Sequence, residues 1–72
     1  MTISKGLYKA LESKYNASID DAKVRMAIYF ENSVAIGEHP QHTEEMDKLI
    51  GQISGAEDRL AILKKYFIKY DG

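Results

Sequence analysis

The sequence concentrates its metal- and proton-binding side chains in one short region. His39 and His42 stand three residues apart, next to Glu38 and two further glutamates. Two histidines at this spacing share a face when both lie in a helix. However, Pro40 follows His39 directly, and a residue before proline is pushed out of the helical region. We therefore expect no metal here. Glu38 and His39 should order a turn, and His42 should lie in the helical turn that follows.

Other catalytic patterns are missing from the chain. It has no Cys, no His-Glu-x-x-His pair and no glycine-rich phosphate loop, and no Ser, His and Asp set stands out. We predict a protein that is not an enzyme and that holds no cofactor. The lack of cysteine fits a reducing, cytoplasmic compartment.

A second group of side chains combines lysines with tyrosines near both ends of the chain. Lysines interleaved with aromatic rings can hold phosphate while a base stacks, so one alternative function is sequestration of a small nucleotide signal of antiviral defence. The candidate residues are Lys5, Tyr8, Lys9, Lys65, Tyr66 and Lys69. The aromatic rings also have a simpler explanation. Most of them fall on the apolar seams described below, where they would pack between helices instead of binding a ligand. The net charge of −1 argues against binding to duplex nucleic acid.

Helical periodicity is clearest in the second half. Between residues 41 and 70 the apolar and small residues recur at alternating spacings of three and four, which is typical of a heptad seam. They are Met46, Leu49, Ile53, Ala56, Leu60, Leu63, Phe67 and Tyr70. Gly51 and Gly55 lie inside this helix although glycine is a poor helix former. They allow close approach of another backbone, are simply tolerated by the helix, or mark a kink.

A similar seam predicts a first helix over residues 4–32. Its members are Tyr8, Leu11, Tyr15, Ser18, Ala22, Met26 and Tyr29. Ser18 with Asp21 imitates a capping box, which would start a new helix, and Ser54 with Glu57 offers another restart. We favour one continuous first helix, because neither proline nor glycine interrupts the region around Ser18 and the seam keeps its phase.

Residues 33–40 form the expected link between the two helices, with Gly37 placed to end a helix and Pro40 placed to open the next. A link this short predicts an all-α, antiparallel helical hairpin that forms one domain over residues 1–72. Both apolar stripes are wider than one partner helix covers. We therefore expect the hairpin to be completed as a homodimeric four-helix bundle.

The link also carries a resemblance. It is similar to the turn of a group of small, mostly uncharacterised helical-hairpin proteins of tailed phages, many of them T4-like and marine phages, which typically reads Asn-Pro-Val-Gly-Ile-Gly-Glu-His-Pro. Here Gly37, Glu38, His39 and Pro40 match, whereas Ser33 and Ala35 replace the usual proline and glycine. The resemblance implies a phage-encoded helical hairpin and brings no established activity with it.

These observations favour an oligomeric interaction protein, made in the host cytoplasm, that modulates a host or phage protein during infection. No apolar run is long enough to predict a membrane span. The binding surface is expected at the acidic turn end, with Gly37, Glu38, His39 and His42 as candidates, or on an exposed helix face. A structural or assembly role in the virion is a further alternative.

Overall fold

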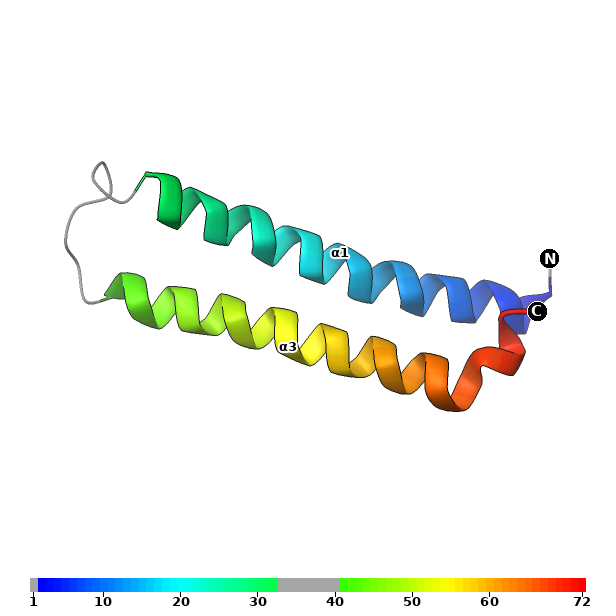
Figure 1. Cartoon of the computed structure of the whole chain (residues 1–72). Coiled ribbons are helices and arrows are strands. Elements are labelled where there is room, and N and C mark those ends of the chain that lie inside the picture. The colour runs from blue at the N-terminus through cyan, green and yellow to red at the C-terminus, as the bar shows by residue number, and fades with distance from the viewer. Residues whose placement is uncertain (1, 33–40) are drawn as a thin grey trace.

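The computed structural model describes residues 2–32 and 41–72. Helix α1 spans Ile3–Glu31, helix α3 spans Gln41–Phe67, and a short 3-10 helix, η1, spans Ile68–Tyr70. The two long helices lie side by side and run in opposite directions (Figure 1). The prediction of an all-α helical hairpin is confirmed. The expected link over residues 33–40 lies outside the described residues.

Both long helices are continuous where the sequence offered a restart. The side-chain oxygen of Thr2 accepts a hydrogen bond of 3.2 Å from the backbone N–H of Lys5, which caps the first turn of α1. No second start occurs at Ser18, and α3 passes through Ser54 without a break. Each apolar seam keeps its phase across these points, so the packing between the helices favours an unbroken helix over a local cap.

The contact between the helices buries a narrow stripe. Tyr8 and Ala22 on α1 and Ala56 and Leu63 on α3 are buried, with half-buried seam residues between them. Leu11, Phe67 and Tyr70 were predicted to belong to the seams but remain at least 40% exposed. The physical reason is geometric, because one helix covers only the central positions of its neighbour's apolar stripe and leaves the flanking positions open.

The hairpin is long and thin. Its principal extents are 50 × 19 × 13 Å, and its radius of gyration is 16.1 Å, against about 11 Å for a compact domain of this length. It exposes 5562 Å², whereas a compact monomer of this mass exposes about 4,500 Å². The excess is on the order of 1,000 Å², as expected for a chain in which two helices cover only one stripe of each other.

The last residues depart from the prediction. The sequence indicated one helix to residue 70, but α3 ends at Phe67, where the backbone takes φ −124° and ψ 10°, and the chain tightens into η1. The C-terminal segment bends toward the start of α1, so the two chain ends lie together (Figure 1). This bend brings Asp71 to an ion pair with Lys9, an interaction that a straight helix end would not reach.

Two glycines in α3 are not required by the hairpin's own packing. A Cβ atom added at Gly51 or at Gly55 would meet nothing within 4 Å. Each glycine nevertheless weakens the helix by about 1 kcal/mol relative to alanine. The sequence left open whether these glycines allow a close approach between helices. Within this hairpin they do not, because neither glycine lies against α1.

The buried stripe makes a first prediction. Leu63→Ala should lower the free energy of unfolding by about 2 kcal/mol or more, because the leucine is 6% exposed and leaves a cavity. The matched change Ile50→Ala, at a residue 52% exposed, should alter it by no more than about 0.5 kcal/mol. Urea unfolding followed by circular dichroism measures both. Equal losses in the two variants would contradict the seam described above.

Candidate functional site

An apolar groove lies at the end of the hairpin where the two chain termini meet. We call it the terminal groove. It encloses about 410 Å³ and is lined by Ser4, Leu7, Tyr8, Leu11, Tyr15, Arg59, Ile62, Leu63, Phe67 and Tyr70. Aliphatic and aromatic side chains from both helices form its walls, and Arg59 is the one charged residue that lines it. A surface of this kind suits another apolar side chain or helix rather than a polar metabolite.

Tyr8 forms part of the floor of this groove. The residue is 3% exposed, and its hydroxyl oxygen is buried without a hydrogen-bond partner among the described residues. Burial raises the pKa of the Tyr8 phenol above its ordinary value, and the nearby carboxylate of Asp71 raises it further. A ring enclosed in this way is not available to stack on a base, so Tyr8 is a packing residue in this structure.

Lys9 ties the C-terminal bend to α1. Its ammonium lies 3.0 Å from Oδ1 of Asp71 and 3.4 Å from Oε1 of Glu12. Hydrogen bonds to Asp71 first and Glu12 second raise the pKa of Lys9. The three side chains form a small charged cluster at the terminal end, in which two carboxylates already neutralise the lysine that was a candidate phosphate ligand.

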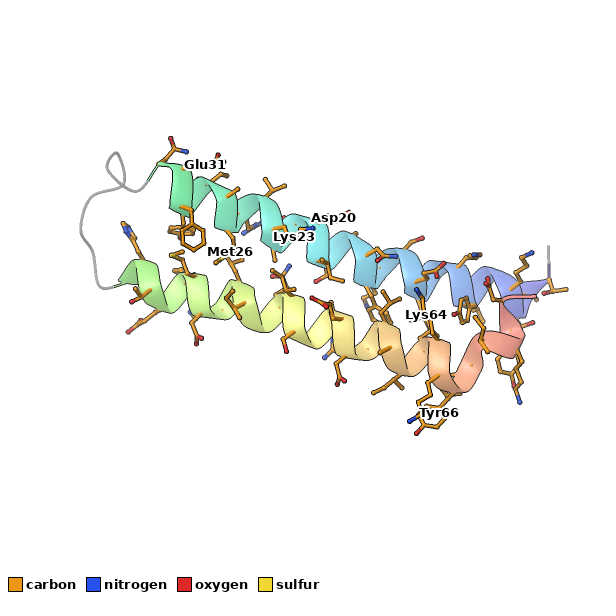
Figure 2. All side chains as sticks on the ribbon, viewed as in Figure 1. Asp20, Lys23, Met26, Glu31, Lys64 and Tyr66 are labelled. Atoms are coloured by element: carbon orange, nitrogen blue, oxygen red, sulfur yellow. The ribbon has the colours of Figure 1, made fainter. Side chains whose placement is uncertain are left out.

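Two lysines of the alternative nucleotide site lie over different tyrosine rings. Tyr66 lies on the side of α3 that faces away from α1, whereas Met26 lies between the helices (Figure 2). The Lys65 ammonium lies 5.2 Å from the centre of the Tyr66 ring, and Lys69 lies 5.1 Å from that of Tyr70. Lys5, half-buried in the first turns of α1, completes the set. Lys65 thus accompanies Tyr66 on the far side of α3, whereas Lys69 accompanies Tyr70, which lines the terminal groove.

At the turn end, His42 packs between the helices. Its ring centre lies 5.7 Å from that of Tyr29, at an interplanar angle of 59°, and the residue is half-buried. The other predicted turn-end residues, Gly37, Glu38 and His39, lie outside the described residues. Where His42 is concerned, the structure shows an aromatic contact that fixes the start of α3 against the end of α1.

A polar contact joins the helices at mid-length. The side-chain amide of Gln52 donates to the backbone oxygen of Ser18 at 2.8 Å and to Oδ2 of Asp21 at 3.3 Å. Asp21 also forms an ion pair of 3.1 Å with Arg25. The hydrogen bonds from Gln52 and then Arg25 lower the pKa of Asp21. If α3 shifted along α1, the Gln52 amide would no longer reach the Ser18 carbonyl. This contact therefore fixes the register of α3 against α1.

Two other kinds of site are not found in the described part of the chain. No three His, Asp or Glu side chains are placed to hold a metal ion. Neither long helix combines the length and apolarity that crossing a bilayer requires.

Comparison with known proteins found no relative of this chain. No protein family, no curated protein and no solved structure matches this chain. The site therefore has to be interpreted from its own residues.

Sequence reasoning did not find the contacts that organise the terminal end. Lys9 and Asp71 are 62 positions apart, and no local pattern links them. Gln52 stands between two seam positions of α3, and a glutamine there was a usable signal of a polar contact across the helices. The buried hydroxyl of Tyr8 follows from the bend at Phe67, which the heptad spacing did not indicate.

The terminal end predicts a loss of stability in alkali. Tyr8 and Lys9 both have raised pKa values in the folded protein, so the stabilisation linked to their protonated forms is complete below the ordinary values and is lost as pH rises from about 10 upward. Melting temperatures measured by circular dichroism from pH 8 to 11 should fall above pH 10.

The variant Tyr8→Phe isolates one contribution. It keeps the buried ring and removes the titrating hydroxyl, so its melting temperature at pH 8 should equal or exceed that of the wild type, and its alkaline loss should be smaller. Tyr66→Phe, at an exposed tyrosine, should keep the wild-type profile. A lower melting temperature for Tyr8→Phe at pH 8 would show that the hydroxyl has a stabilising partner.

Proposed function

We propose that this chain is a non-enzymatic interaction protein of a tailed phage, which binds and modulates a host or phage protein during infection. The observation that carries the proposal is the distribution of apolar side chains. Twelve large apolar residues are at least 40% exposed, whereas four hydrophobic residues are buried, among the residues that the structure describes. A protein that keeps so much apolar surface in water gains free energy when another protein covers it.

A partner surface is available on α3. Ile50, which is 52% exposed, and the half-buried Ile53 lie in a shallow hollow together with Ser54, Glu57 and Asp58. Two carboxylates beside two isoleucines favour a partner that offers apolar and basic side chains together. Such a partner would gain from apolar burial at the centre and from charge attraction at the rim.

The phage origin is supported by the sequence of the link. Gly37, Glu38, His39 and Pro40 match the turn of tailed-phage hairpin proteins residue by residue. Since those proteins have no established activity, the resemblance supports the source and the hairpin. The interaction role is supported by the exposed apolar surface.

Photo-crosslinking tests this function directly. A photoreactive phenylalanine analogue in place of Ile50, in cells infected by a phage that encodes this protein, should give one discrete adduct with a second protein. The charge reversals Glu57→Lys and Asp58→Lys in the same background should reduce the adduct yield, because they remove the attraction for basic side chains. The identity of the adduct follows from mass spectrometry.

The matched control places the same analogue at Asp20, an exposed residue of α1. It should give no discrete adduct. Adducts with this chain alone, or an adduct that forms equally from Asp20, would contradict the proposed function.

A further inference from the structure

One exposed stripe of α1 has the same pattern in both directions. Its residues are Leu7, Leu11, Lys14, Asp21, Val24 and Ile28. The successive spacings are four, three, seven, three and four residues, so they are the same in both directions. The order of residue types is apolar, apolar, basic, acidic, apolar and apolar, so reversal exchanges the basic and acidic positions. We call this pattern palindromic. The four apolar residues are 63%, 40%, 62% and 50% exposed in chain order, and both charged residues are exposed as well.

The stripe follows one flank of the hairpin. Leu7 and Leu11 line the terminal groove. Lys14 lines a smaller hollow of about 220 Å³ at mid-length, beside Gly51 and Gly55. Tyr15 and Arg59 line both hollows, so the two hollows are neighbours along this flank. Ile28 lines a third hollow at the turn end.

We infer that this flank binds a second copy of the same chain, with the two α1 helices antiparallel and the two-fold axis between Ala17 and Ser18. In that arrangement Leu7 meets Ile28 of the second copy and Leu11 meets its Val24. Lys14 meets Asp21 of the second copy, and the three contacts repeat on the other side of the axis. A two-fold interface needs a surface that is complementary to itself, and a palindromic stripe provides one.

The charges of the whole hairpin favour the same orientation. On the terminal side of the Gln52–Ser18 contact, residues 2–17 and 53–72 hold seven Lys and Arg against four Asp and Glu. On the other side, residues 18–32 and 41–52 hold three Lys and Arg against six Asp and Glu. An antiparallel copy places each basic half against an acidic half, whereas a parallel copy would place like charges together.

The space on this flank also fits a second copy. The room beyond Gly51 and Gly55, where an added Cβ meets nothing, allows another helix to approach α3 closely. Lys14 forms no ion pair among the described residues, and the Asp21 side chain keeps 50% of its surface exposed beside Arg25.

Charge reversal with complementary mixing tests the inference. Lys14→Glu alone sets glutamate against Asp21 at both ends of the dimer, and Asp21→Lys alone sets lysine against Lys14. Each variant should raise the dissociation constant by on the order of tenfold or more, measured by sedimentation velocity. An equimolar mixture of the two variants should recover the wild-type dimer, because both charge pairs are then attractive.

Recovery on mixing separates association from folding. Within one chain Lys14 and Asp21 are seven residues apart along the helix, about 10 Å, so neither variant can repair the other inside a hairpin. Lys23→Glu and Asp20→Lys make the same charge changes at exposed positions of α1 outside the stripe, and they should leave the dissociation constant within about twofold.

Three results would overturn the inference. They are a wild-type protein that stays monomeric at millimolar concentration, single variants that dimerise like the wild type, and a mixture that remains as weak as its components. The inference concerns association of identical chains and does not rest on the second protein proposed above, so a failed crosslink at Ile50 leaves it standing.

Discussion

Two α-helices in contact cover only a narrow stripe of each other, and this hairpin carries apolar side chains far beyond that stripe. The inner positions hold Tyr8, Ala22, Ala56 and Leu63, and most of the remaining large apolar residues are exposed. A body 13 Å thick along its shortest axis has no room for a central core. The need to cover these helix faces explains why the structure offers grooves and why its stability is expected to depend on a second chain.

Polar and aromatic contacts complement the thin apolar seam by fixing the position of one helix relative to the other. Gln52 sets the register at mid-length through the Ser18 carbonyl. Lys9 and Asp71 hold the C-terminal bend against α1, and the Tyr29–His42 contact holds the turn end. Exposed ion pairs add little free energy. These contacts hold the two helices together on either side of the terminal groove, which Leu7, Leu11 and Ile62 line.

The helical hairpin could be predicted from sequence because spacing alone encodes it. The heptad seams indicated two long helices, and the absence of proline and glycine near Ser18 correctly favoured one continuous α1. The end of α3 at Phe67 could not be predicted, since it depends on a contact between residues 62 positions apart. Leu11, Phe67 and Tyr70 line the terminal groove but stay exposed, because periodicity places a residue on a face and does not say how wide a contact that face makes. The His39 site lies in the link, outside the described residues, and stays a prediction.

We infer that a second copy covers the exposed flank of α1 and thereby stabilises the hairpin, so the temperature of thermal unfolding should depend on protein concentration. When folding and association are coupled, mass action raises the melting temperature with protein concentration. We predict a rise of several degrees between micromolar and millimolar protein, together with a solution mass of twice 8.2 kDa at the upper end. A melting temperature that stays constant over this range, with the mass of one chain throughout, would contradict the account.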